Sequence, residues 1–270
     1  MCGTASCGAT RGSARGRALR RWVVTISALV AVAACADAPA PPPPDRGVPD
    51  QRVASMGTTL PPEQPLPTGA ECAQHVPRTG REQRPANAAA NSSTPGPVSL
   101  PAWHDFWDPR VNTEYVPRID GNFTGTTDEI LWWGACKWGF DVDFVRAMAA
   151  AETSWYQHKV GDYEQDPKHC AAGYQAPCPT SFGILQIKHY FRPGSYPASQ
   201  RHTAFNVDYA LAGLRGCFQG WVTYLADGYR PGDLWGCAGW HYSGEWKTPP
   251  ALGYISRVQA QLKQKPWLTW

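Results

Sequence analysis

The chain has 270 residues, and its 25 Lys and Arg against 22 Asp and Glu give a formal net charge of +3 with histidine neutral. Five arginines and no acidic residue precede residue 35, so the remainder carries 20 basic and 22 acidic side chains. This near balance excludes a general electrostatic attraction to nucleic acid or to an anionic membrane as the basis of function.

Residues 1–34 have the pattern of a bacterial export signal. The arginines are followed by an apolar run of about 13 residues, which is too short to cross a bilayer as a helix. The run ends in the tetrapeptide Val32-Ala33-Ala34-Cys35, which resembles the site at which bacterial lipoproteins are cut before a lipidated cysteine. We therefore expect a signal peptide over 1–34, lipidation of Cys35, and anchoring to the outer face of a bacterial membrane. An ordinary signal peptide that releases a secreted protein is the alternative.

The segment 35–99 is rich in Pro, Ala, Thr and Asn and poor in large apolar side chains. It cannot bury enough apolar surface to offset the entropy lost on ordering, so we expect an extended low-complexity tether. Aromatic residues return at Trp103. One compact domain is therefore expected over 100–270, which is long enough for a single core.

Six cysteines lie beyond Cys35, and an even number in an exported chain indicates disulfides. Sequence alone does not choose among the many connectivities that six cysteines allow. The candidate pairs are Cys170 with Cys178, which would close a small loop, Cys217 with Cys237, which would tie two helices, and, by elimination, Cys72 with Cys136. Zinc at His169 and Cys170 is disfavoured because the Cys-x-x-Cys spacing of structural zinc sites is absent.

Helical patterns dominate the expected domain. Thr126 and Glu129 have the spacing of a capping box, which predicts a helix that runs to about Trp138 and stops at Gly139. Further helices are expected from near Asp141, from a cap at Asn206, over 232–240, and after Pro249-Pro250. No long alternating strand pattern is present, so the fold class is predicted to be mainly α.

The stretch 161–179 is polar and is expected to be an irregular loop. Asp162, Glu164 and Asp166 alternate there, as in half of a calcium loop, but the glycine and the closing glutamate of such a loop are missing. We therefore expect no bound metal and no cofactor.

Glu152 is the residue whose setting is chemically unusual. In a helix from Asp141, it shares one face with Val142, Val145 and Ala149, which are all apolar. Burial disfavours the charged form of a carboxyl, so the pKa of Glu152 should rise and leave a proton donor near neutral pH. The alternative is a glutamate at the edge of the apolar face, paired with a Lys or Arg.

Four blocks of sequence together carry a family resemblance. Glu152-Thr153-Ser154-Trp155, the run from Ser181 to Ile187, the segment from Asn206, and the turn from Trp240 to Gly244 follow one another in this order. This arrangement resembles the soluble lytic transglycosylase domain, which is related in fold to goose-type lysozyme. The resemblance implies a mainly α, lysozyme-like domain that cleaves the β-1,4 bond between N-acetylmuramic acid and N-acetylglucosamine in peptidoglycan.

The resemblance also assigns roles to residues. It implies that Glu152 is the catalytic acid at a cleft across its helix, with Ser181 and Gln186 lining the cleft beside it. The substrate-binding residues that it implies are Ser181, Gly183, Gln186, Ile187, His241 and Tyr242. The expected partner is the glycan strand, and the protein is expected to be a monomer that binds no nucleic acid.

The expected mechanism uses one carboxyl, as acid and then as base, and gives 1,6-anhydromuramic ends. A lysozyme-type hydrolase is the alternative, for which Asp162, Glu164, Asp166 or Glu245 would supply a second carboxylate. A non-catalytic cell-wall-binding protein with the same fold is the third possibility.

Overall fold

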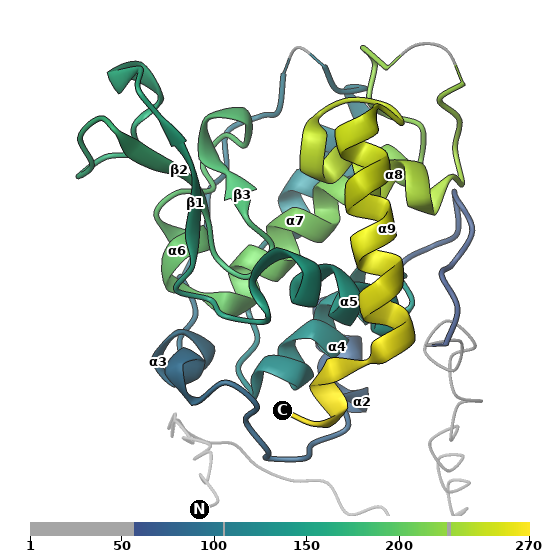
Figure 1. Cartoon of the computed structure of the whole chain (residues 1–270). Coiled ribbons are helices and arrows are strands. Elements are labelled where there is room, and N and C mark those ends of the chain that lie inside the picture. Colours follow the sequence, from purple (N-terminus) through teal and green to yellow (C-terminus); the bar gives the residue numbers. More distant parts are fainter. Residues whose placement is uncertain (1–56, 105, 226–227) are drawn as a thin grey trace, which may run out of the picture. The chain divides into compact units, whose positions relative to one another are not determined.

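The structure is a computed structural model that describes residues 57–104, 106–225 and 228–270 (Figure 1). These residues belong to one compact unit. The expected signal peptide, the expected lipidation at Cys35 and the first part of the expected tether, 35–56, lie outside the described residues. No helix in the described ranges combines the length and the apolar character that crossing a membrane requires.

The described domain is mainly helical, as predicted. Its long helices are α4 (Thr127–Trp138), α5 (Val142–Thr153), α7 (Thr203–Phe218), α8 (Leu234–Ser243) and α9 (Pro249–Gln264). Shorter helices are α2 (Gly69–His75), α3 (Ala88–Asn91) and α6 (Ala198–Arg201). Single 3-10 turns occupy Pro85–Asn87, Val116–Arg118, Pro167–His169, His189–Phe191 and Pro266–Leu268, and a π turn occupies Val111–Tyr115.

The two consecutive helices that lead to Glu152 begin and end where the sequence indicates. Thr126 accepts a hydrogen bond from the amide of Glu129, and the Glu129 carboxylate accepts one from the amide of Thr126, which completes the predicted capping box. Gly139 then ends α4 in the left-handed region, at φ 66°. Asp141 caps α5 by accepting from the amide of Phe144 at 2.8 Å.

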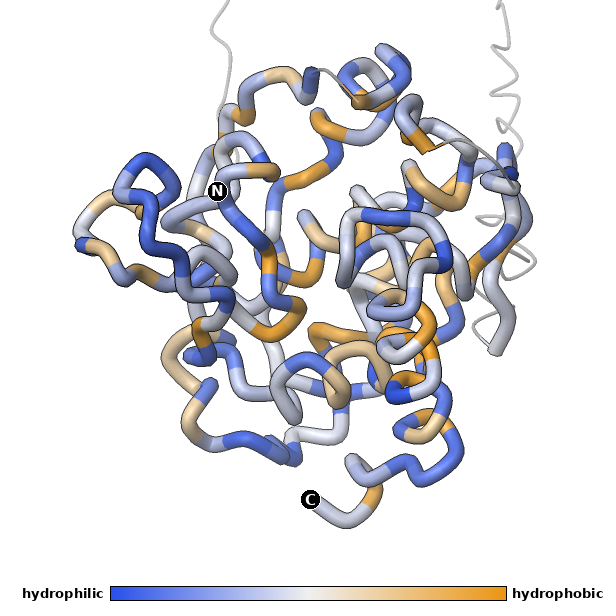
Figure 2. Tube along the Cα trace, turned by 45° about the horizontal axis from the view of Figure 1, so that its top comes forward, coloured by the Kyte–Doolittle hydropathy of each residue, from blue (hydrophilic) through white to orange (hydrophobic). Residues whose placement is uncertain are grey.

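The predicted loop at 161–179 is wrong in part, because its two ends are strands. β1 (Val160–Glu164), β2 (Cys178–Phe182) and β3 (Ile187–Lys188) form an antiparallel sheet in that order. The strands lack an alternating pattern because every residue of β2 is buried, whereas β1 is largely exposed. The sheet lies on one side of the helices, and the connection between β1 and β2 projects from it with mostly hydrophilic residues (Figures 1 and 2).

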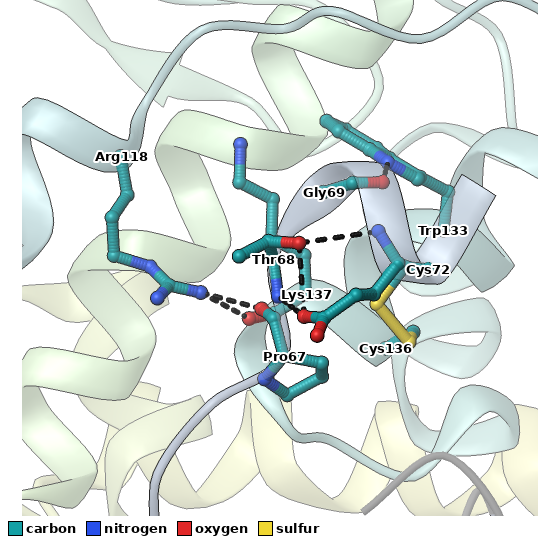
Figure 3. The surroundings of a disulfide bond; sticks show 9 residues. Pro67, Thr68, Gly69, Cys72, Arg118, Trp133, Cys136 and Lys137 are labelled. Carbon is teal, nitrogen blue, oxygen red and sulfur yellow. Dashed lines mark hydrogen bonds between the residues drawn. A yellow bond between two sulfur atoms is a disulfide. The ribbon is translucent and has the colours of Figure 1, made fainter. Parts of the chain in front are cut away.

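The prediction of an extended tether over 35–99 is wrong for residues 57–99, which pack on the helical domain. Cys72 in α2 is bonded to Cys136 in α4, and the indole of Trp133 donates to the carbonyl of Gly69 at 2.9 Å (Figure 3). Arg118 donates to the carbonyl of Pro67 at 2.7 Å, beside the same disulfide. These attachments use a disulfide and backbone carbonyls, so the low apolar content of the segment gave no sign of them.

The three disulfides match the predicted pairs. Cys72–Cys136, Cys170–Cys178 and Cys217–Cys237 have Cα–Cα distances of 5.8, 5.6 and 5.8 Å. The bond between residues 217 and 237 joins α7 to α8, as expected for a link between two helices. The bond between residues 170 and 178 closes the loop that carries the chain from β1 into β2.

Helix α7 passes through the centre of the core, since all of its residues are buried. It begins at Thr203, three residues before the predicted cap, so Asn206 lies inside the helix and is buried. α9 packs on α5 and α8 (Figure 1) through Ala251, Tyr254 and Val258. Leu252, which follows Ala251 in the same helix, is exposed.

Candidate active site

A cleft of about 700 Å³ opens between the sheet and α8. α5 contributes Glu152, β1 contributes Asp162, and β3 contributes Lys188 to its lining. The lining residues are Phe106, Glu152, Gly161, Asp162, Gln186, Ile187, Lys188, Phe191, Arg192, Ala210, Tyr224, Trp240, His241, Tyr242, Ser243 and Gly244. The structure thus brings together Glu152 and four of the six predicted substrate-binding residues, and the cleft meets the helix that carries Glu152.

Glu152 lies in the last turn of α5. The helix ends because Ser154 and Trp155 adopt left-handed backbone conformations, with φ of 52° and 70°. Trp155 is fully buried, and its indole donates to the carbonyl of Arg146 at 2.9 Å. This packing fixes the end of the helix, and with it the position of Glu152 at the cleft.

About half of the Glu152 carboxyl groups carry a proton at neutral pH. The Glu152 side chain is 9% exposed, and burial raises its pKa to about 7, with a smaller contribution from the negative charge of Asp162. A hydrogen bond from Tyr254 and the charge of Arg257 act in the opposite direction. The last turn of a helix also disfavours negative charge, because backbone carbonyls point toward it.

Tyr254 and Arg257 reach this site from α9, and neither residue was predicted from the sequence. The Tyr254 hydroxyl is buried, and its hydrogen bond to Glu152 is a loose one within the described residues. The Tyr254 ring stacks on Tyr242 at 4.8 Å, and the Arg257 guanidinium lies 4.8 Å from the centre of the Tyr242 ring. The only signal in the sequence was the spacing of Tyr254 from Ala251 and Val258.

His241 is an uncharged neighbour of Glu152. Its Nε2 atom lies 3.7 Å from Glu152 Oε1 and donates to the carbonyl of Leu185 at 3.1 Å. Burial, and then the charge of Arg192, lower the pKa of His241 to about 4, so this contact is not an ion pair at neutral pH. No ion pair in the described ranges joins Glu152 to a Lys or Arg, which contradicts the alternative of a paired glutamate at the edge of its helix face.

Asp162 is the second carboxylate of the cleft. Its backbone is left-handed, at φ 51°, and Thr180 donates to its carbonyl at 2.6 Å. Ser181 donates from Oγ to Asp162 Oδ2 at 2.5 Å. Ser181 is buried behind the cleft wall, so the prediction that it lines the cleft is wrong, and its contact holds Asp162 instead.

Gly183 also lies behind the cleft wall. A Cβ on Gly183 would come within 2.2 Å of the Asn206 amide nitrogen, so no larger residue fits there. Asn206 in turn accepts from the amide of Leu185 and donates to the carbonyl of Phe182, at 2.9 and 2.8 Å. These bonds position the turn that presents Gln186 at the cleft.

The predicted residues Gln186, Ile187, His241 and Tyr242 do line the cleft. Gln186 has a positive φ of 44°, and its side-chain amide donates to the carbonyl of Gly183 at 2.8 Å. Gly161 leaves room for this side chain, because a Cβ there would lie 2.6 Å from Gln186 Oε1.

Exposed aromatic rings gather at the cleft. Phe191, Tyr224 and Tyr242 line it and are 48%, 49% and 47% exposed, although large hydrophobic side chains are rarely so exposed in this domain. Most of the described tryptophans are buried and pack in the core. The aromatic rings most exposed at the cleft are therefore tyrosines and a phenylalanine rather than tryptophans.

The other carboxylates that were weighed as a second catalytic group do not line the cleft. Glu164 pairs with Lys188 at 3.3 Å, and Asp166 caps the 3-10 turn that follows it. Glu245 lies just beyond the cleft residue Gly244. Within the described ranges, no group of three or more His, Cys, Asp or Glu side chains could hold a metal ion.

The arrangement is a buried carboxyl with a pKa of about 7 at the edge of an aromatic-lined cleft, with a neutral histidine beside it and a second carboxylate on the sheet. Such a carboxyl can donate a proton to a leaving oxygen and can take up a proton once it is ionised. No protein-family model matches the chain, and no curated protein or solved structure matches it.

Proposed function

We propose that this protein is a peptidoglycan lytic transglycosylase, with Glu152 as its acid and base. The observation that carries the proposal is the Glu152 carboxyl, whose pKa of about 7 leaves about half of it protonated at neutral pH where the cleft meets α5. The four sequence blocks that resemble soluble lytic transglycosylases support the same function, and all four contribute residues to the cleft lining. The proposal includes a lysozyme-like identity for the helical domain.

The proposed reaction begins when Glu152 gives its proton to the oxygen that links C1 of N-acetylmuramic acid to N-acetylglucosamine. The C1–O bond breaks, and the N-acetyl group of the same muramic residue stabilises the positive charge at C1. The ionised Glu152 then removes the proton from the muramyl 6-hydroxyl, whose oxygen bonds to C1. The products are a 1,6-anhydromuramic end and a free 4-hydroxyl, and Glu152 regains its proton.

The setting suits a long sugar polymer outside the cell. Clefts of several hundred Å³ are typical of ligand sites, and the exposed rings of Tyr224 and Tyr242 could stack on sugar faces. Three disulfides indicate an oxidising environment outside the cytosol. Lipid anchoring through Cys35 is part of the proposal as the means by which the protein stays at the envelope.

Hydrolysis is a second candidate, and Asp162 is the observation that favours it. Asp162 lines the same cleft as Glu152, and its charge raises the Glu152 pKa. A carboxylate in that position could activate a water molecule or stabilise the positive sugar centre. In that case the product would have a reducing muramic end rather than an anhydro ring.

The products of digestion test these functions. Purified peptidoglycan is incubated with the wild type, Glu152→Gln, Asp162→Asn and the matched surface control Glu114→Gln, and the muropeptides are weighed by mass spectrometry. We expect anhydro-muropeptides from the wild type, Asp162→Asn and Glu114→Gln, and at least a 100-fold lower rate from Glu152→Gln, at the lower end of what general acid catalysis contributes.

Other outcomes would replace this proposal. Reducing ends from the wild type, lost in Asp162→Asn, would identify a hydrolase. Binding to peptidoglycan without any product from the wild type would identify a cell-wall-binding protein and exclude both enzymatic functions.

A further inference from the structure

Arg192 is a cation in the cleft that the proposed chemistry does not use. It follows the 3-10 turn His189–Phe191 and lines the cleft together with Glu152. Its guanidinium lies 5.0 Å from the ring centre of Trp240 and 5.9 Å from that of Trp107. The positively charged guanidinium is attracted to the faces of both indoles, which helps to hold the side chain in place.

Arg192 has no acidic partner among the residues that the structure describes. Its one hydrogen bond there is a long contact of 3.4 Å from Nη1 to the carbonyl of Phe191. The titratable groups that act on it are the neutral Tyr209 and Tyr224. The other basic residue of the cleft differs, because Lys188 is paired with Glu164 at 3.3 Å.

An unpaired guanidinium in a partly buried place is unusual. Removal of a charge from water is costly unless an opposite charge or several hydrogen bonds replace the lost hydration. Burial accordingly lowers the pKa of Arg192, although a guanidinium stays protonated at any ordinary pH. Its fork of N–H donors matches the two oxygens of a carboxylate.

The Arg192 guanidinium lines the same cleft as Glu152, the proposed catalytic acid. The positive charge of Arg192 helps to lower the pKa of His241, whose Nε2 atom lies 3.7 Å from Glu152 Oε1. Phe106 and Tyr224 pack edge to face at 5.7 Å and line the cleft with Arg192. A ligand that stacks on the exposed Tyr224 ring would therefore present its substituents to the guanidinium.

We propose that Arg192 is the anion-binding element of a substrate subsite and holds a carboxylate of the glycan strand. The inference rests on the proposed function and specifies its substrate as an acidic glycan rather than a neutral polymer such as chitin. The carboxylate is either the lactyl group of a muramic residue without a peptide or a carboxylate of the stem peptide. Both sources present the same chemistry to the guanidinium.

Calorimetric binding in a Glu152→Gln background tests the subsite without turnover. Three ligands are compared, which are glycan strands stripped of stem peptides, the same strands with their carboxylates converted to carboxamides, and strands that carry stems. The tested changes are Arg192→Gln and Arg192→Lys. Arg201→Gln is the matched control, because Arg201 is exposed at the end of α6 and does not line the cleft.

We expect Arg192→Gln to weaken binding of at least one carboxylate-bearing strand by about 10- to 100-fold and to leave binding of the amidated strand unchanged. Arg192→Lys should weaken binding of the same strand by less than Arg192→Gln does, since the ammonium keeps the charge but not the paired N–H donors of the guanidinium. Loss only with stripped strands identifies the lactyl carboxylate, and loss only with stem-bearing strands identifies the stem. Arg201→Gln should bind all three ligands as the background protein does.

Equal weakening of all three ligands by Arg192→Gln would overturn the inference and give Arg192 a structural role, as would no weakening of any ligand. Failure of the proposed function is a separate result. The wild type would then release no muropeptides, while the three binding comparisons would still measure whether Arg192 selects a carboxylate.

Discussion

At the scale of single residues, the protonation state of Glu152 decides what the cleft can do. Burial raises its pKa to about 7, and Tyr254 and Arg257 limit that rise. A carboxyl poised near neutral pH can both give and accept a proton during one reaction cycle. The same pKa makes two measurable quantities depend on pH, one of them independent of any catalytic activity.

The first quantity is stability. The folded-state pKa of Glu152 is raised above its unfolded value, so the native state binds the proton more tightly and stability falls as pH rises through about 7. As pH rises from about 4 to about 8, the wild type loses this contribution and Glu152→Gln does not. We therefore expect the unfolding free energy of Glu152→Gln, relative to that of the wild type, to increase by about 3 kcal/mol over this range. Denaturant unfolding of both proteins at the two pH values measures this, and an unchanged difference would mean that the carboxyl is not desolvated.

The second quantity is the rate. If Glu152 is the acid, kcat/KM should fall as pH rises through about 7, because the ionised form cannot donate. Tyr254→Phe removes a hydrogen bond that favours the ionised form, so it should move this fall to higher pH. Tyr242→Phe keeps the stacked ring pair and is the control for the midpoint. Equal midpoints in all three proteins would show that Tyr254 does not act on the acid.

At the scale of elements, contacts between segments that lie far apart in the sequence shape the site. The sheet supplies Asp162 and presents Gln186, and the segment 57–99 is fastened to the back of the helices. The Cys72–Cys136 disulfide spans 64 residues, whereas Cys170–Cys178 spans 8. In the chain-entropy account, a longer closed loop restricts the unfolded chain more strongly.

Removal of each disulfide should therefore have unequal effects. We expect Cys72→Ser with Cys136→Ser to destabilise the protein by about 4 kcal/mol, and Cys170→Ser with Cys178→Ser by about 2.5 kcal/mol. Denaturant unfolding gives both values, and limited proteolysis of the first variant should cut within 57–99 earlier than in the wild type. A smaller loss from the longer loop would indicate that α2 holds to α4 without its disulfide.

At the scale of the whole molecule, one buried polar group ties separate parts of the chain together. Asp208 in α7 is fully buried and accepts from Lys137 at 2.8 Å and from the indole of Trp138 at 2.7 Å. The backbone amides of Asp120 and Gly121 also donate to it, both at 2.9 Å. Because α7 is the central helix, this network fixes α4 and the preceding loop against the core.

Removal of one charged partner from this network should lower the free energy of unfolding. Asp208→Asn leaves the buried Lys137 with the half-exposed Asp120 as its acid, so we expect a loss of about 3 kcal/mol in unfolding free energy. The matched change Asp108→Asn breaks an ion pair with the exposed Arg110 and should change stability by less than about 1 kcal/mol. Equal losses in denaturant unfolding would show that the buried network contributes no more than a surface pair.

The sequence by itself determined the local features of this protein. The capping box at Thr126, the stop at Gly139 and the apolar face that carries Glu152 follow from interactions within a few residues, and all three are present in the structure. The three cysteine pairs were among the candidates, but the sequence did not choose their connectivity, which the structure supplies. The local features are readable because helix caps, turns and helix periodicity depend on near neighbours along the chain.

Only the tertiary structure decided which groups meet at the cleft. Tyr254 and Arg192 come from different parts of the chain, and nothing in their local sequence marks them as members of the site. Asp162 was one of four candidate carboxylates among which the sequence did not choose. Ser181 and Gly183 were expected at the cleft from their motif, but strand pairing and the contact with Asn206 place them behind its wall. The physical reason is that desolvation, charge and contact depend on distance in space, which the folded chain sets between residues far apart in sequence.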